Sequence, residues 1–373
     1  MRVGVDLLFI QPGRNRGTET YVQGLLRGLG VREGLELVLF TNQLNHSQFS
    51  EVRGVRRRRC SISGSNRLQR IVFQQTVLPR LAKAERCDLL FCPGYLAPVF
   101  SSIKTVVAIH DTQFIDVPGS IPAGQRLAYR AIVPLGARRA KAIITISSFS
   151  KGRIVEALKI KPERVAVTYL APKSFDERGL SSMEERVFVE KHLLTRPYFL
   201  SVSNQNPHKN ISGLIKAFVE FKATTGAEID LVFAGSNLSA AERNSGISSR
   251  NDIRFLGYIN DAELAVAYRR SRAFVLASFY EGFGLPIVEA MANGVPVACS
   301  NRASLPEVAG DAALLFDPGC NKSIGDAFGT LFLDRERVRQ LVDAGYQNLN
   351  RFSWDKCATE TYAVFSQAVG SRD

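Results

Sequence analysis

No apolar stretch in this sequence approaches the roughly 18 residues that a membrane-spanning helix requires. The apolar start of the chain is interrupted by Asp6, and no small-residue cleavage site follows it. We therefore expect the first segment to be a buried strand and not a signal peptide. These absences exclude an integral membrane protein and predict a cytoplasmic one.

Cysteine pairs and metal-ligand spacings are also missing. The six cysteines are scattered without a CxxC pair, and a chain of 373 residues is large enough to fold without disulfides. No spaced cluster of Asp, Glu or His indicates a metal site. We expect reduced thiols and no metal cofactor.

The sequence does contain a regular alternation of apolar runs with segments of helical length, which predicts parallel sheets covered by helices on both faces. The expected strands are 3–9, 35–40, 89–92, 105–109, 142–146 and 164–168, and then 198–202, 230–234, 253–255, 273–277, 296–299 and 313–316. Length and pattern together predict an α/β protein with two doubly wound, Rossmann-like domains. We expect the domains at 1–172 and 198–353, a linker at 173–197 and a last helix within 354–373.

Positive charge is distributed unevenly along the chain. Residues 1–172 hold 26 Lys and Arg against 11 Asp and Glu, a net charge of +15, whereas the remainder is close to neutral. Such a domain favours an anionic partner, which is a membrane surface, a phosphate-bearing acceptor or a nucleic acid. The densest run, 56–59, consists of four arginines and is equally consistent with a solvated loop or strand edge.

A glycine-containing loop follows the expected strand 273–277. Its glycines allow a ligand to approach the backbone closely, and Pro286 opens a helix that Gly294 ends. The N-terminus of that helix suits a diphosphate. Glu281 in the loop and Glu289 in the helix can accept hydrogen bonds from sugar and ribose hydroxyls. The alternative is that the first solvates a loop and the second is an exposed helix residue.

The segment 280–297, YEGFGLPIVEAMANGVPV, resembles the donor-binding motif of the retaining glycosyltransferases of family four, a family that includes bacterial mannosyltransferases. The resemblance implies the GT-B fold, in which two Rossmann-like domains face a cleft. It also implies that Glu281 contacts the transferred sugar, in a catalytic role, and that Glu289 contacts the ribose. Further donor contacts are implied for the loop residues Gly282, Phe283, Gly284 and Leu285. Glu307, in a later segment similar to the family, is another candidate for donor contact. The resemblance also implies that the last helix, within 354–373, packs back onto the first domain.

The segment 203–210, after the expected strand 198–202, is similar to the phosphate-binding loop of the same family. Lys209 stands at the position of the donor-phosphate lysine. Where the family usually has an arginine, five residues earlier, this sequence has Asn204, so one cation is missing. His208 is one candidate for the missing charge. On its own, a lysine at this position is equally a solvated residue at a helix start.

In the first half, His110 follows the expected strand 105–109, where it can bind a sugar hydroxyl or orient a backbone group near the reacting carbon. The resemblance favours this catalytic role over a purely structural histidine. The family's glycine-containing loop corresponds to 14–21, which implies donor contacts for Gly17 and Thr18. We expect Arg14 or Arg16 to supply the charge that Asn204 lacks, although both also fit an exposed basic loop.

The predicted function is transfer of a sugar, with retention of configuration, from a nucleotide diphosphate sugar to a saccharide acceptor. By family frequency the donor is GDP-mannose, and the basic first domain suits a lipid-linked acceptor at the inner face of the plasma membrane, in polysaccharide or lipopolysaccharide synthesis. The diphosphate can leave without a metal. Two alternatives remain: a nucleotide-sugar epimerase of the GT-B fold, and a non-enzymatic basic protein that binds membrane or nucleic acid. A nucleic acid partner is not expected for the enzyme.

Overall fold

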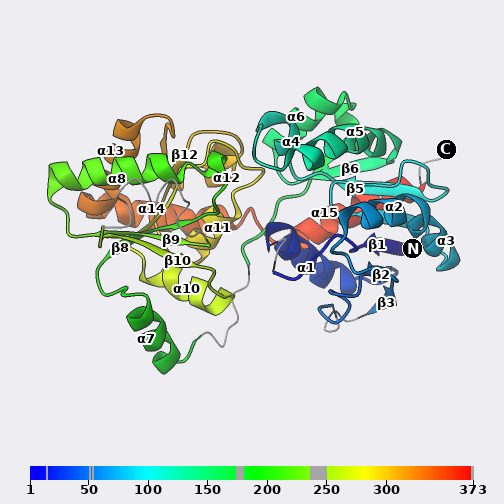
Figure 1. The fold of residues 1–373 in the computed structure, drawn as a ribbon, viewed down its shortest axis with the longest axis horizontal. Helices are drawn as coiled ribbons and strands as arrows, with labels where there is room; N and C mark the ends of the chain where they lie inside the picture. The colour runs from blue at the N-terminus through cyan, green and yellow to red at the C-terminus, as the bar shows by residue number, and fades with distance from the viewer. Residues whose placement is uncertain (14–15, 50–51, 53, 174–179, 236–249, 371–373) are drawn as a thin grey trace. The chain divides into compact units, whose positions relative to one another are not determined.

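The computed structural model describes residues 1–13, 16–49, 52, 54–173, 180–235 and 250–370, and the chain divides into two compact units. Unit 1 comprises Met1–Ala171 and Phe352–Asp373, and unit 2 comprises Pro172–Arg351. Each contains one parallel sheet with helices on both faces (Figure 1). The predicted α/β fold with two doubly wound domains is confirmed.

Unit 1 has a seven-stranded sheet in the order β3-β2-β1-β4-β5-β6-β7. Its strands are β1 Arg2–Asp6, β2 Glu36–Thr41, β3 Val55–Arg59, β4 Leu89–Cys92, β5 Lys104–Ala108, β6 Ala142–Thr145 and β7 Val165–Val167. Its helices are α1 Arg16–Gly30, α2 Arg67–Thr76, α3 Leu78–Ala84, α4 Gln113–Asp116, α5 Ala123–Arg139, α6 Ser148–Leu158 and α15 Trp354–Gly370, with a 3₁₀ turn at Pro162–Arg164.

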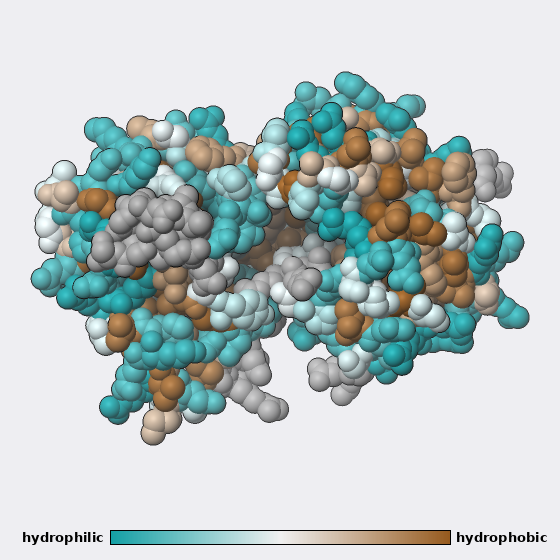
Figure 2. Space-filling model, in the orientation of Figure 1, coloured by the Kyte–Doolittle hydropathy of each residue, from teal (hydrophilic) through white to brown (hydrophobic). Residues whose placement is uncertain are grey.

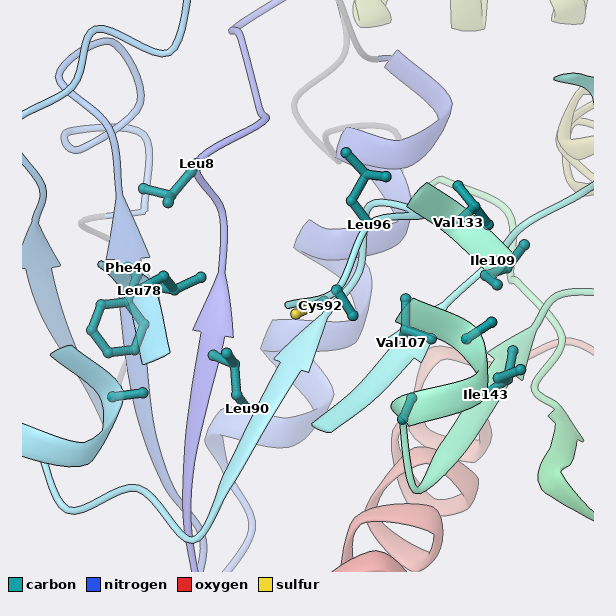
Figure 3. Packing of buried hydrophobic residues seen from close by; sticks show 14 of the residues in the cluster. Leu8, Phe40, Leu78, Leu90, Cys92, Leu96, Val107, Ile109, Val133 and Ile143 are labelled. Atoms are coloured by element: carbon teal, nitrogen blue, oxygen red, sulfur yellow. The ribbon is translucent and has the colours of Figure 1, made fainter. Parts of the chain in front are cut away.

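One face of this sheet packs against α3, α5 and α6. Leu90 and Cys92, two residues apart on β4, point to the same side and meet apolar residues of the neighbouring strands and helices. Figure 3 shows this cluster from Leu8 and Phe40 on one side to Ile109 and Ile143 on the other. The nearly continuous apolar composition of the buried strands is what made them recognisable in the sequence.

The opposite face is covered by α1 and α15, which pack against each other. Glycines make this close approach possible: a Cβ on Gly24 would lie 2.3 Å from the ring of Trp354, and one on Gly28 would lie 2.7 Å from Ala358. Phe365 of α15 packs against Phe91 of β4, with ring centroids 5.0 Å apart. The last helix is therefore built into the core of unit 1.

Unit 2 has a six-stranded sheet in the order β10-β9-β8-β11-β12-β13. Its strands are β8 Tyr198–Val202, β9 Asp230–Ala234, β10 Ile253–Gly257, β11 Ala273–Leu276, β12 Val297–Ser300 and β13 Ala313–Phe316. Its helices are α7 Ser182–Lys191, α8 Ile211–Thr225, α10 Asp261–Arg270, α11 Leu285–Ala292, α12 Leu305–Ala309, α13 Asn321–Leu333 and α14 Arg335–Leu349, with a 3₁₀ turn at Pro207–Lys209.

Two segments differ from the simplest interpretation of the sequence. The arginine run 56–59 forms most of the edge strand β3, with its side chains exposed. The segment 173–197, expected to be a linker, contains α7, whose start has a capping box between Ser181 and Glu184. The six cysteines form no disulfide. Within the described ranges, none of the helices is long and apolar enough to cross a bilayer.

Candidate functional site

The ends of β8 and β11 bring together the two segments that the sequence identified in unit 2. These strands are hydrogen-bonded neighbours in the sheet, and their carboxyl ends lie at the same edge. The backbone N–H of Phe279 donates to the carbonyl of His208 over 2.7 Å, which ties the loop after β11 to the loop after β8. Side chains 70 or so residues apart in sequence therefore meet at one point.

Lys209 and Glu281 form an ion pair at this point. The Lys209 Nζ donates to Oε1 of Glu281 at 2.6 Å, and both side chains are largely buried, with exposures of 17% and 14%. The same carboxylate oxygen accepts a hydrogen bond from Ser278 Oγ at 2.7 Å, and the Glu281 carbonyl accepts one from Ser304 Oγ at 2.9 Å. The sequence left open that Lys209 and Glu281 are only solvated surface residues, and this burial and pairing argue against that alternative.

The loop between β11 and α11 depends on glycine. Gly284 has φ +97°, and a Cβ there would lie 2.5 Å from Cδ2 of Leu305. Pro286 lies in the first turn of α11, and Gly294 follows its end with φ +70°, as the sequence predicted. The remaining predicted donor residues of this loop, Gly282, Phe283 and Leu285, occupy the same turn, with the first two buried.

Glu289 is buried in α11, with 6% exposure. The Tyr268 hydroxyl donates to its Oε2 at 3.1 Å. Burial raises the pKa of Glu289 to about 7, and the tyrosine hydrogen bond opposes this shift. This burial excludes the alternative interpretation, in which Glu289 is an exposed helix residue. A carboxyl group held in this way exchanges its proton near neutral pH.

The loop after β8 does not replace the missing cation. Asn204 is exposed, and its Oδ1 accepts a hydrogen bond from the N–H of Asn206 at 3.1 Å, so it shapes the turn. His208 is buried, and burial together with the Lys209 charge lowers its pKa to about 4. His208 is neutral at physiological pH, which argues against the charge that we expected from it. Glu307, the other candidate for donor contact, lies on α12, and its backbone carbonyl accepts a hydrogen bond from Arg351.

In unit 1, His110 lies two residues after β5 and is 6% exposed. Its Nε2 lies 3.0 Å from the carbonyl oxygen of Pro93, which can only accept, so Nε2 carries the proton. Burial lowers the pKa of His110 to about 4, and the edge of Tyr21 packs against the ring. The neutral imidazole donates its N–H to the backbone carbonyl of Pro93. Of the two predicted roles, this geometry favours the orientation of a backbone segment.

The start of α1 carries the other predicted residues of unit 1. A Cβ on Gly17 would meet nothing within 4 Å, so packing within the chain does not require a glycine there. Thr18, one residue later, lines a pocket. Arg14 and the side chain of Arg16 lie outside the described residues. Their predicted role as diphosphate cations stays a prediction.

That pocket was not recognised in the sequence. It lies in unit 1, with a volume of about 280 Å³, and is lined by residues that follow β1 and β4 and by residues of α2 and α5. Arg67, Arg70 and Gln74 from α2 contribute the polar wall, and Tyr95 and Tyr129 contribute the aromatic one. The only signal in the sequence is the spacing of three polar residues on one face of α2. Elsewhere in the described chain, no three His, Cys, Asp or Glu side chains cluster as metal ligands would.

Comparisons with known proteins agree with this architecture. Residues 182–348 match the family model described as glycosyl transferases group 1, and residues 15–171 match the model described as glycosyltransferase family 4. O-antigen chain mannosyltransferase B of Escherichia coli is 34% identical over 70% of this chain and 70% of its own length. O-antigen chain mannosyltransferase RfbU of Salmonella typhimurium is 26% identical over 71% and 68%.

Solved structures show the same fold at low sequence identity. Alr3699/HepE of Anabaena in complex with UDP-glucose superposes with a TM-score of 0.73 at 19% identity, covering 98% of this chain and all of that one. Sucrose-phosphate synthase of Thermosynechococcus elongatus gives a TM-score of 0.75 at 17% identity, with 98% of both chains covered. The predicted GT-B fold is confirmed, and the chain belongs to the group 1, family 4 glycosyltransferases, as a hexosyltransferase.

Proposed function

We propose that this enzyme transfers mannose, with retention of configuration, from GDP-mannose to a lipid-linked saccharide in the synthesis of a surface polysaccharide such as an O-antigen. The observation that carries the proposal is the Lys209–Glu281 pair at the ends of β8 and β11. The sugar and the pathway are supported by two relatives that are named O-antigen chain mannosyltransferases.

Each side chain of the donor site has a task in this proposal. Lys209 neutralises the departing diphosphate, and the backbone N–H groups at the start of α11 add a positive dipole. Glu281 accepts hydrogen bonds from hydroxyls of the transferred sugar, and Glu289 accepts them from the ribose. No metal is needed if these groups bear the charge of the leaving group.

Retention in this proposal comes from attack on the same face as the departing group, with the leaving phosphate as the base for the acceptor hydroxyl. His110 contributes by fixing the Pro93 carbonyl, and with it the loop that leads to the pocket of unit 1. Trapping a covalent glycosyl-enzyme would overturn this route.

The test combines a donor screen with product analysis. We expect GDP and GDP-mannose to raise the melting temperature of the purified protein more than UDP, ADP and their sugars, with and without EDTA. Incubation with GDP-mannose and an acceptor should give an α-linked mannoside by NMR. Preference for a UDP-sugar would overturn the donor assignment, and a changed sugar nucleotide without acceptor would indicate an epimerase instead. A metal requirement would show as loss of activity in EDTA.

We also propose that unit 1 binds an anionic membrane surface. Leu68 and Val72 on the outer face of α2 are 73% and 53% exposed, and Phe100 is 81% exposed. Figure 2 shows apolar surface over α2 and α3, bordered by hydrophilic residues. Arg80 and Lys83 of α3 line a hollow together with Phe100. Apolar side chains flanked by cations, on a unit with an excess of positive charge, match a bilayer that contains anionic lipid.

Vesicle flotation tests this surface. The protein should float with vesicles that contain phosphatidylglycerol and much less with pure phosphatidylcholine, and Phe100→Ser should weaken flotation. Leu333→Ser in unit 2 is the matched control, because Leu333 is similarly exposed, at 69%. Equal flotation with both lipids, or an equal loss in both variants, would contradict the proposal.

A further inference from the structure

The pocket of unit 1 has the dimensions and chemistry of a site for one small polar ligand. Its volume of about 280 Å³ lies just below the roughly 300–1,000 Å³ typical of small-molecule sites. Five chain segments contribute to its lining: the end of β1 with the turn after it, α1, α2, the turn after β4, and α5. A single sugar ring with one substituent fits this space, and a longer oligosaccharide has to extend out of it.

The pocket lining contains two arginines and one carboxyl group, Asp6, which attracts Arg70 electrostatically but forms no ion pair with it. Arg67 and Arg70 lie one turn apart on α2, and neither forms an ion pair with any residue that the structure describes. Arg70 is half-buried, and it donates one long hydrogen bond of 3.4 Å to the carbonyl of Gly64. Two guanidinium groups at one pocket, one of them partly desolvated, create a strong preference for an anion.

The nearest carboxyl group is already occupied. Asp6 is buried at the end of β1, where it accepts hydrogen bonds from the N–H of Leu8 at 3.0 Å and from Gln74 Nε2 at 2.5 Å. Burial raises the pKa of Asp6, whereas its two hydrogen bonds and the charge of Arg70 oppose this shift. The hydrogen bonds to Asp6 come from Leu8 and Gln74, so both guanidinium groups keep donors for a ligand. Planar, forked guanidinium groups favour the oxygens of a phosphoryl group.

The opposite wall is aromatic. The rings of Tyr95 and Tyr129 are stacked, with centroids 6.0 Å apart and an angle of 28° between planes. Tyr95 has φ +68°, a conformation that costs free energy for a non-glycine residue and is concentrated at functional sites. Its N–H donates to Ala108, and its ring lies 5.5 Å from that of His110. Aromatic faces next to amides such as Gln125 suit the apolar face and the hydroxyls of a sugar ring.

The orientation of α2 supports the same interpretation. Arg67, Arg70 and Gln74, at spacings of three and four residues, face the pocket, whereas Leu68 and Val72 face outward. The same helix also packs on the core through Ile71 and Phe73, so only the part of its inner face at the pocket is polar. Gln74 is satisfied by Asp6 and Leu96, and a polar ligand would give the two arginines a partner.

We infer that this pocket binds a saccharide that carries a phosphoryl group, with the ring against Tyr95 and Tyr129 and the phosphoryl group on Arg67 and Arg70. The inference rests on the proposed function, since it gives the chemical class of the acceptor. The phosphoryl group can belong to a lipid-linked saccharide or to a free sugar phosphate, because both present the same oxygens to the arginines.

Calorimetry on the full-length protein tests the inference with N-acetylglucosamine 1-phosphate as the probe. Free N-acetylglucosamine and inorganic phosphate serve as ligand controls. We expect the probe to bind at least tenfold more tightly than either control. Arg70→Gln should weaken binding about 10- to 100-fold, the range for a charge-assisted hydrogen bond. Arg67→Gln should weaken it in the same direction, and this exposed residue can be changed without risk to folding.

Two further variants separate the sites. Arg27→Gln removes one exposed arginine from α1 and should leave binding unchanged, which controls for net charge. Lys209→Gln should leave probe binding unchanged but weaken GDP. If Lys209→Gln abolishes probe binding and the α2 variants do not, the probe occupies the donor site and the inference is wrong. It is also wrong if inorganic phosphate or the free sugar binds as tightly, or if the probe does not bind.

A second probe, a short-chain prenyl diphosphate-linked N-acetylglucosamine in detergent, distinguishes the two sources of the phosphoryl group by its affinity. Tighter binding of this probe than of the sugar phosphate, with the same sensitivity to Arg70→Gln, indicates a lipid-linked acceptor. Equal binding indicates a free sugar phosphate. GDP binding that persists while both probes fail would sink the inference and leave the proposed donor chemistry standing.

Discussion

Removing Lys209 and neutralising Glu281 should have opposite effects on the binding of a nucleoside diphosphate. In the structure the two side chains form a largely buried ion pair at 2.6 Å. A diphosphate that binds Lys209 competes with Glu281 for the same ammonium group. Lys209→Ala should therefore weaken GDP by about 1.5–3 kcal/mol, the contribution of a charge-assisted hydrogen bond, which is roughly 10- to 150-fold in Kd.

Glu281→Gln removes the competing carboxylate, and the glutamine oxygen can still accept the hydrogen bond from Ser278. GDP has no sugar, so this variant should bind it as tightly as the wild type or more tightly. Transfer from GDP-mannose should fall at least 100-fold, because the interaction with the sugar hydroxyls is lost in the transition state. A simple structural role for Glu281 predicts instead that both measurements decline together.

Stability provides an independent measurement for the same pair. Lys209→Ala leaves a mostly buried carboxylate without its cation, so the free energy of unfolding should fall by about 1–3 kcal/mol, between the values for exposed and buried pairs. The double variant should recover part of this loss. Titration calorimetry with GDP and denaturant unfolding measure the two effects. A GDP Kd within twofold of wild type in Lys209→Ala would refute the reasoning.

Three further predictions concern single residues. Because the pKa of Glu289 is raised to about 7, the folded state binds more protons than the unfolded chain between about pH 4.5 and 7. The contribution of Glu289 to stability therefore falls as the pH rises through that window. In denaturant unfolding, Glu289→Gln should equal the wild type at pH 4.5 and be more stable at pH 8, by up to about 3 kcal/mol. Gly284→Ala should lower the free energy of unfolding by about 1–3 kcal/mol, because of its positive φ and the close Leu305, whereas Gly325→Ala in α13, where a Cβ meets nothing, should not. His110→Ala should lower kcat up to about 100-fold with unchanged GDP affinity, because it displaces the Pro93 segment; a rise in the GDP Kd would place His110 in the donor site instead.

Most of the fold could be predicted from the sequence because buried parallel strands are nearly continuous apolar runs. Strands such as β4, β8 and β9 have the predicted bounds. The strand β3 could only be left open, because four consecutive arginines have no apolar alternation. It forms as an edge strand that is paired with β2 alone, where exposed charged side chains are tolerated.

The sequence could predict which residues of the candidate donor site lie close together, but it could not predict their contacts. Parallel strands place their carboxyl ends at one edge, so Lys209 and Glu281 could be expected near each other. Their direct pairing depends on the loop conformations, which Gly284 and the Phe279–His208 backbone hydrogen bond determine. The sequence also could not show that His208 is buried and neutral, because a histidine beside a lysine suggests a second cation.

The positive charge of unit 1 shows why the density of charge in a sequence is a poor guide to a binding site. The conspicuous run at β3 is partly neutralised, because Arg56 and Arg58 form ion pairs with Glu85 at 3.1 and 3.7 Å. Arg67 and Arg70 are inconspicuous in the sequence, yet they have no ion pair in the described chain and lie at a pocket. Salt screens exposed cations strongly, whereas it screens a half-buried guanidinium such as that of Arg70 much less. Binding of a phosphorylated saccharide should therefore survive salt concentrations that abolish binding to anionic vesicles.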